Sequence, residues 1–207
     1  MTVEVASAEQ PRRRSRRGAA VTGPAARPRL DVLASTVQDV VSCAGGWLTD
    51  RALAGWDIDV LVADSGFDQG DTRALRILGA SAQGLHRATA TSERARPAAV
   101  AVAADLFTAD GRVRERVLHA YDRDLAEVTV WGAQIPAELS ARFTSVEHVL
   151  SAAAKVFKAH ALCAAATSAM TVSATEAFCR GALRGSSGGL RPVGQVAAGG
   201  YTVIDKL

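Results

Sequence analysis

The stretch VVSCAGGWL at residues 40–48, together with WDIDVLVAD at residues 56–64, decides the fold that the sequence predicts. Its first part has the apolar spacing of a helix. Residues 58–63 are almost all apolar and include β-branched side chains, a pattern typical of a strand buried on both faces. This run ends at the carboxylate of Asp64. We therefore expect a helical segment that leads into a buried strand, beside which the other elements lie.

Two further apolar runs resemble this strand. Residues 98–104 are closed by Asp105, and residues 125–131 end at Trp131. Helical patterns separate the three runs, and strands that alternate with helices predict parallel βαβ units with right-handed crossovers. The sequence thus predicts a small three-layer, Rossmann-like α/β domain, with a parallel sheet of about three or four strands flanked by helices.

The helices are predicted from apolar side chains that recur at steps of three and four residues. The apolar periodicity of the first helix begins at Leu30, which precedes the expected N-cap Asp31 as a staple residue, and continues through Leu33, Val37 and Val40. Further helical segments are expected at residues 72–78 before Gly79, after Asp110, and as a short turn after Pro136.

A long Ala-rich helix is predicted near the C-terminus. Residues 144–147 (TSVE) have the S/T-x-x-E form of a capping box, which marks the start of many helices. The same form recurs at residues 173–176 (SATE), so the helical region is expected to break near Thr171. Two lysines and a histidine interrupt residues 149–174, and such side chains are expensive in a lipid bilayer. We therefore expect a packed helix and no transmembrane segment.

Charge is distributed unevenly along the chain. Residues 1–29 carry seven Arg and two Glu, a net charge of +5, and have too few large apolar side chains to fold alone. Residues 30–179 carry 13 basic and 18 acidic side chains, a net charge of −5. Glycine becomes frequent from residue 181. We expect a disordered Arg-rich arm at residues 1–29, a single α/β domain at residues 30–180 and a mobile Gly-rich tail at residues 181–207.

The arm carries the most specific functional signal in the sequence, a cluster of guanidinium groups. Its members are Arg12, Arg13, Arg14, Arg16 and Arg17. Because arginine binds phosphates and carboxylates in a forked geometry, the cluster is expected to contact nucleic acid or an acidic protein. No aromatic side chain is interleaved to stack on bases. The alternative is a solvated leader without a specific role.

A ligand is expected at the carboxyl ends of the predicted strands, because open parallel sheets bind ligands there. Asp64 and Asp105 stand at two of these ends, and they would approach each other if their strands were neighbours. Two such carboxylates could hold Mg²⁺ or share a proton. The alternative is that each Asp caps the following helix or solvates a loop. No P-loop motif accompanies them.

The glycine pair Gly45-Gly46 allows two interpretations. Gly46 lies eighteen residues before Asp64, a spacing that suits a dinucleotide-binding turn and its ribose-binding acid. However, the G-x-G-x-x-G fingerprint is absent, and the bulky Trp47 follows the pair. The alternative is that the glycines end a helix or let another element pack closely against it. Gly45 and Gly46 stay candidate ligand-binding residues, with the cofactor unknown.

Cysteine and histidine supply no further site. Cys43, Cys163 and Cys179 are widely spaced and form no CxxC pair, so they predict small buried thiols in a reducing cytoplasm and no zinc site. His160 and Cys163 share a helical face but lack a third ligand. The sequence therefore assigns neither a metal ligand nor a catalytic residue.

Three functions stay open at this point. The leading hypothesis is a non-enzymatic accessory or regulatory protein of the bacterial cytoplasm, which binds a partner or small ligand and docks through its arm. The second is a small Mg²⁺-assisted enzyme that acts on a phosphorylated substrate at Asp64 and Asp105. The third is a scaffold that forms a homodimer through the Ala-rich helix, whose small side chains permit close packing.

Overall fold

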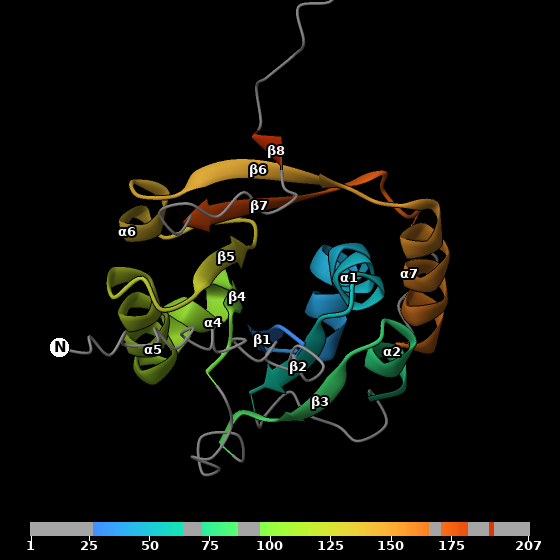
Figure 1. Cartoon of the computed structure of the whole chain (residues 1–207), viewed down its shortest axis with the longest axis horizontal. Helices are drawn as coiled ribbons and strands as arrows, with labels where there is room; N and C mark the ends of the chain where they lie inside the picture. Colours follow the sequence, from blue (N-terminus) through green and yellow to red (C-terminus); the bar gives the residue numbers. More distant parts are fainter. Residues whose placement is uncertain (1–26, 64–71, 87–95, 166–170, 182–190, 193–207) are drawn as a thin grey trace, which may run out of the picture.

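Figure 1 shows an α/β fold in which a mixed sheet curls around helix α1 (Val37–Leu53). The computed structural model describes residues 27–63, 72–86, 96–165, 171–181 and 191–192. Within these ranges the sheet has eight strands in the order β3-β2-β1-β4-β5-β7-β6-β8. The strands are β1 (Arg29–Ala34), β2 (Asp57–Val62), β3 (Ser81–Gly84), β4 (Ala99–Ala103), β5 (Glu127–Trp131), β6 (Thr144–Val149), β7 (Thr175–Gly181) and β8 (Arg191–Pro192). The other described helices are α2 (Thr72–Ile77), α4 (Ala104–Ala109), α5 (Gly111–Asp122), α6 (Ala137–Ser140) and α7 (Ala152–Ala164).

The sheet has a parallel part and an antiparallel part. β3, β2, β1, β4 and β5 are parallel, whereas β7, β6 and β8 each run antiparallel to the strand before them in the sheet. Helices α1, α2 and α7 cover one face, and α4 and α5 lie on the other (Figure 1). The predicted α/β class is confirmed, and the three predicted strands correspond to β2, β4 and β5. The sheet is larger than the three or four strands expected.

The core occupies both faces of the parallel part. Every residue of β4 and β5 is buried. Trp47 and Trp131 are the largest fully buried side chains, and most of the remaining core is Val, Leu and Ala. Small aliphatic side chains suit strands that are covered on both faces, because helices can then approach the sheet closely.

The predicted helix start at Asp31 is wrong, because the residues from Arg29 to Ala34 form the strand β1. β1 pairs in parallel with both β2 and β4 and is the central member of the parallel part. A strand buried on both faces is apolar at nearly every position, so its side chains also satisfy a helical spacing. Asp31 does not cap a helix: it is buried in β1, where it forms ion pairs with Arg29 and Arg116.

Both predicted capping boxes near the C-terminus are also wrong. Residues 144–149 form β6, and residues 175–181 form β7, which pairs antiparallel with it. The helix between them, α7, begins later, and its N-cap is Ser151, whose hydroxyl accepts a hydrogen bond from the backbone N–H of Ala154. The capping-box form is short, and the pairing of two strands that are distant in sequence overrides it. None of the described helices combines the length and apolar character needed to cross a membrane.

Other local signals are confirmed. Asp110 caps α5, where its carboxylate accepts hydrogen bonds from the backbone N–H groups of Arg112 and Val113. Gly79 follows α2 with a φ of 81°, a left-handed conformation that favours glycine at the end of a helix. The short helix α6 begins directly after Pro136. These positions were predictable because a single residue and its immediate neighbours determine each of them.

Asp50 joins the second half of α1 to the junction between β6 and α7. Its Oδ2 accepts hydrogen bonds from His148 Nε2 at 2.7 Å and from the backbone N–H of Ser151 at 3.2 Å. Burial alone would raise the pKa of Asp50, but the hydrogen bonds from Ser151 and His148 outweigh it, and the pKa lies below its ordinary value. The ionised carboxylate therefore stabilises the folded state at every pH above the ordinary pKa of an aspartate. This stabilisation is lost as the pH falls through the lowered pKa of the folded protein.

We expect Asp50→Asn to be less stable than the wild type near neutral pH. The difference between the two proteins should shrink as the pH falls from about 4, where the carboxyl of the unfolded chain becomes protonated, through the lowered pKa of the folded protein. Melting temperatures of both proteins, measured across this range, give the difference directly. A difference that is constant with pH would show that the charge of Asp50 does not contribute to stability.

Candidate functional site

A hollow of about 560 Å³ opens at the carboxyl end of the parallel strands. Open parallel sheets bind ligands beyond these ends, at the point where the strand order reverses. Here β2 and β3 lie on one side of β1, and β4 and β5 lie on the other, so this point is between β1 and β4. The hollow lies beside it, and its polar lining consists of Asp39, Asp105, Thr108 and Gln134, with Trp131 next to them.

Asp39 occupies the first turn of α1, the helix that follows β1. The hydroxyl of Thr36 caps this helix and accepts a hydrogen bond from the backbone N–H of Asp39 at 3.1 Å. The Asp39 carboxylate accepts two further bonds, from Trp131 Nε1 to Oδ2 at 2.7 Å and from Cys43 Sγ to Oδ1 at 3.4 Å. Because Trp131 is only 1% exposed, its indole is a fixed donor. The two donors hold the carboxylate in one orientation at the wall of the hollow.

Cys43 serves as a neutral donor to this carboxylate. Burial, and to a smaller extent the nearby charge of Asp39, raises the pKa of the Cys43 thiol to about 12. The thiol is therefore protonated at neutral pH, and a protonated thiol is a weak nucleophile. Cys43 thus helps to orient Asp39 and is a poor candidate for a nucleophile.

The opposite wall comes from α4 and from the loop after β5. Asp105 lies in the first turn of α4, and Thr108 lies one turn later. Gly132 brings the loop against the start of α4: its φ is 139°, and a Cβ there would lie 2.9 Å from the Cβ of Ala104. Because only glycine permits this approach, the loop can place Gln134 at the rim of the same hollow. The wall thus offers a carboxylate, a hydroxyl and an amide.

The structure brings one of the predicted ligand-binding residues, Asp105, to this hollow. Gly45 and Gly46 lie in the middle of α1 and do not line it, and Asp64 lies outside the described residues. The expected proximity of Asp64 and Asp105 assumed that their strands were neighbours, but β1 separates β2 from β4. The cluster Arg12, Arg13, Arg14, Arg16 and Arg17 also lies outside the described residues.

Sequence reasoning missed Asp39 and Trp131. The T-x-x-D form of Thr36 and Asp39 would have marked the true start of α1, and thus a strand end before it. Nothing in the sequence indicates that Trp131 contacts a residue 92 positions earlier. The expectation of three buried thiols is partly wrong, because Cys163 is exposed and Cys43 and Cys179 are half-buried. Among the described residues, no group of three or more His, Cys, Asp or Glu side chains could hold a metal ion.

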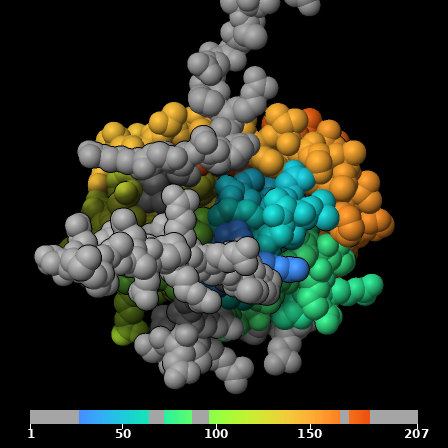
Figure 2. All heavy atoms as spheres, viewed as in Figure 1, coloured from blue at the N-terminus to red at the C-terminus, as the bar shows by residue number. Residues whose placement is uncertain are grey.

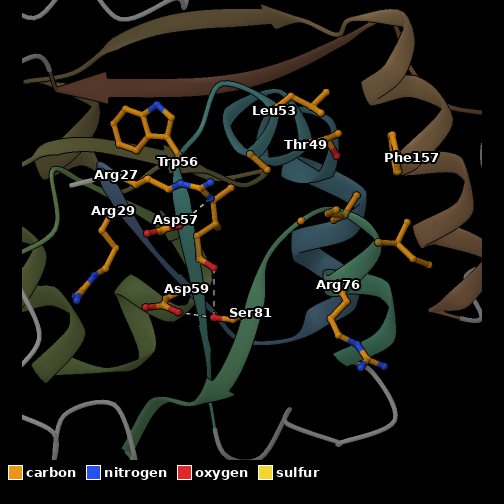
Figure 3. Close-up of a pocket in the computed structure, with 15 residues that line it drawn as sticks. Arg27, Arg29, Thr49, Leu53, Trp56, Asp57, Asp59, Arg76, Ser81 and Phe157 are labelled. Carbon is orange, nitrogen blue, oxygen red and sulfur yellow. Dashed lines mark hydrogen bonds and ion pairs between the residues drawn. The ribbon is translucent and has the colours of Figure 1, made fainter. Parts of the chain in front are cut away.

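A larger hollow, of about 730 Å³, lies at the opposite, amino end of β1, β2 and β3 (Figure 3). Residues of α1, α2 and α7 also line this hollow, and on the molecular surface α1 (cyan) lies between α2 (green) and α7 (orange) (Figure 2). In this hollow Arg27 pairs with Asp57 at 3.7 Å, and Ser81 donates a hydrogen bond to Asp59. We place the candidate site in the smaller hollow, because it lies at the strand ends where parallel sheets bind ligands and contains an oriented carboxylate.

No protein-family model matches the sequence, and no curated protein matches it. Solved structures do resemble the fold. A deacetylase of teicoplanin biosynthesis, solved in complex with teicoplanin, has a TM-score of 0.53 at 11% identity, over 73% of this chain and 97% of that chain. The A40926 pseudoaglycone deacetylase Dbv21 has a TM-score of 0.51 at 15% identity, over 68% of this chain and 82% of that chain. GalB, the 4-carboxy-2-hydroxymuconate hydratase from Pseudomonas putida KT2440, has a TM-score of 0.51 at 14% identity, over 74% and 95%.

These comparisons correct the leading hypothesis from the sequence. The prediction of a non-enzymatic accessory or regulatory protein is wrong, because the three solved structures described above, which resemble this fold, are enzymes: two deacetylases and a hydratase. At 11–15% identity the likeness extends to the fold and carries no residue of those proteins over to this chain. Which chemistry the hollow can support therefore depends on the side chains that line it.

Proposed function

We propose that the protein is an enzyme that activates a water molecule in the hollow between α1 and α4, for attack on an electrophilic carbon of a small polar substrate. The observation that carries this proposal is the oriented carboxylate of Asp39, held by Trp131 and Cys43 at the point where a parallel sheet binds its ligand. The fold supports it, since a hydratase and a hydrolytic deacetylase both use water as the nucleophile.

Asp39 is the general base in this proposal. Each oxygen of a carboxylate has two lone pairs, so Asp39 can accept a proton from water while Trp131 and Cys43 still donate to it. In the hydrolysis of an N-acetyl group, the water oxygen bonds to the carbonyl carbon and its proton passes to Asp39. The C–N bond then breaks, and Asp39 returns the proton to the leaving nitrogen. Acetate and an amine are the products, and Asp39 ends as it began.

The groups on the opposite wall bind the substrate. Asp105, Thr108 and Gln134 offer acceptors and donors to N–H and hydroxyl groups, and they approach the hollow from elements other than that of Asp39. Both charged residues of the lining are carboxylates. This charge disfavours phosphorylated substrates more than singly charged carboxylates, because a phosphate carries nearly two negative charges and the repulsion inside the hollow grows with charge.

The proposal is tested with two sets of compounds, N-acetylated amines assayed by acetate release and unsaturated carboxylates assayed by loss of absorbance. We expect Asp39→Asn to lower kcat about 10²- to 10⁴-fold, the usual contribution of a general base. Asp105→Asn should mainly raise KM, because it removes binding common to the ground and transition states. Asp57→Asn, in the other hollow, is the matched control and should leave turnover unchanged.

Two outcomes would contradict the proposal. One is full activity of the Asp39→Asn variant towards a compound that the wild type converts. The other is the absence of turnover of both sets of compounds by the wild type. Turnover of the unsaturated carboxylates alone would identify the reaction as a hydration, and release of acetate alone would identify it as a hydrolysis.

A further inference from the structure

A buried ion pair connects α7 and β7 and contacts the middle of α1, the helix that carries Asp39. Lys158 and Glu176 are 4% and 5% exposed, and Lys158 Nζ lies 2.6 Å from Glu176 Oε1. Removing two charges from water is unfavourable unless each finds further hydrogen bonds. Both charges find them on the backbone of α1.

The ion pair contacts three backbone groups in the middle of α1. Lys158 Nζ donates to the carbonyl oxygen of Ser42 at 2.6 Å. Glu176 accepts from the N–H of Gly46 to Oε1 and from the N–H of Trp47 to Oε2, both at 2.8 Å. In a regular α-helix the Ser42 carbonyl and the Gly46 N–H bond to each other. The ion pair thus contacts both ends of one bond of the helix.

These contacts have the character of helix caps. At the C-terminal end of a helix, a cation beside a backbone carbonyl is stabilising, and Lys158 makes such a contact with Ser42. At the N-terminal end, a carboxylate beside backbone N–H groups is stabilising, and Glu176 makes such contacts with Gly46 and Trp47. α1 is one continuous helix, and the pair bonds to its backbone where its two halves meet. The first half carries Asp39, and the second half carries Asp50 and Arg51 with their contacts to the rest of the fold.

Gly45 and Gly46 make the backbone accessible to the ion pair. A Cβ at Gly46 would lie 2.2 Å from Leu150 Cδ2 and 3.2 Å from Glu176 Oε1, so no side chain fits there. A Cβ at Gly45 would lie 3.3 Å from Leu78 Cδ1 and 3.6 Å from Lys158 Cγ, a tight but smaller conflict. The interpretation that the glycine pair permits close packing therefore applies here: without side chains at these positions, the Glu176 carboxylate can reach the backbone of α1.

We infer that Lys158 and Glu176 are positioning residues for Asp39: by bonding to the backbone in the middle of α1, they set where its first half places the Asp39 carboxylate in the hollow. Neither residue lines the hollow, so neither touches the substrate. The inference deepens the proposed function and rests on it for the role of Asp39. The coupling between the ion pair and Asp39 can be measured without any substrate.

The test uses the indole N–H signals in a ¹H–¹⁵N spectrum of the full chain, which has three tryptophans. Asp39→Asn assigns the signal of Trp131, whose Nε1 donates to Asp39. Glu176→Gln is expected to displace this signal, although Glu176 does not touch Trp131. It should also accelerate amide hydrogen exchange at Gly46 and Trp47 by about ten- to a hundredfold, because each N–H loses a charged acceptor. Gly45→Ala, a milder change, should displace the Trp131 signal in the same direction by a smaller amount.

Asp50→Asn is the matched control, because it weakens the contacts of the second half of α1 and leaves the ion pair intact. It is expected to leave the Trp131 signal in place. An unmoved Trp131 signal in folded Glu176→Gln and Gly45→Ala proteins, or an equal displacement in Asp50→Asn, would overturn the inference. If Asp39→Asn keeps full activity while Glu176→Gln still moves the Trp131 signal, the proposed function fails and the coupling stands.

Discussion

Replacing Lys158 by methionine is expected to lower the free energy of unfolding by about 3–5 kcal/mol, the usual cost of removing one partner of a buried ion pair. Methionine keeps most of the length and the apolar stem of lysine, so the packing of α7 against α1 changes little. What changes is charge. Glu176, 5% exposed, would retain its carboxylate without a cation, and the carbonyl of Ser42 would lose the donor at 2.6 Å.

Urea denaturation, followed by far-UV circular dichroism, measures this loss. Lys155→Met, one turn earlier on α7, is the matched control and should change stability by less than about 0.5 kcal/mol. The double variant Lys158→Met/Glu176→Leu should recover part of the loss, because an apolar pair of similar volume often replaces a buried ion pair without penalty. Recovery should be incomplete, since the N–H groups of Gly46 and Trp47 would lack their acceptor. A loss below about 1 kcal/mol in Lys158→Met would mean that water solvates Glu176.

The strands that the sequence revealed are those with a single consistent signal. β2, β4 and β5 are apolar, rich in β-branched residues and bounded by polar side chains, so only one interpretation suits them. β1 has the same burial, but Leu30 and Leu33 continue with Val37 at a helical spacing across the end of the strand. Periodicity alone cannot separate a strand buried on both faces from the first turns of a buried helix.

Sequence reasoning missed β6 and β7 for a different reason. Each overlaps an S/T-x-x-E sequence, which is a local signal, whereas their pairing joins residues such as Thr144 and Arg180 that are far apart in the chain. The same distinction governs the candidate site. Asp105 was predictable because it directly follows a strand, but Asp39 depends on recognising β1, and the bond from Trp131 depends on β1 and β5 flanking β4. Local signals predict where elements end, and the sheet order decides which ends meet.

Gly46→Ala is expected to destabilise the protein by about 1–3 kcal/mol, the usual cost of inserting an extra carbon into a packed core. At an exposed helix position the same change would stabilise by about 1 kcal/mol, because alanine has the higher helix propensity. The sign reverses here because the new Cβ would lie 2.2 Å from Leu150 Cδ2 and 2.4 Å from Leu150 Cγ. Since Cγ is close to the backbone, a change of rotamer at Leu150 does not remove the conflict, and the junction between β6 and α7 must shift.

The control for this prediction is the neighbouring glycine. Gly45→Ala meets its nearest atom at 3.3 Å, at the end of the Leu78 side chain, so helix propensity should offset most of the conflict. A double-mutant cycle isolates the clash. Leu150→Ala alone should cost about 2–5 kcal/mol, and adding Gly46→Ala to it should cost less than in the wild type, because the conflicting atoms are gone. Additive losses would show that Leu150 is not what excludes a side chain at residue 46, and would leave the contact with Glu176 as the reason for glycine.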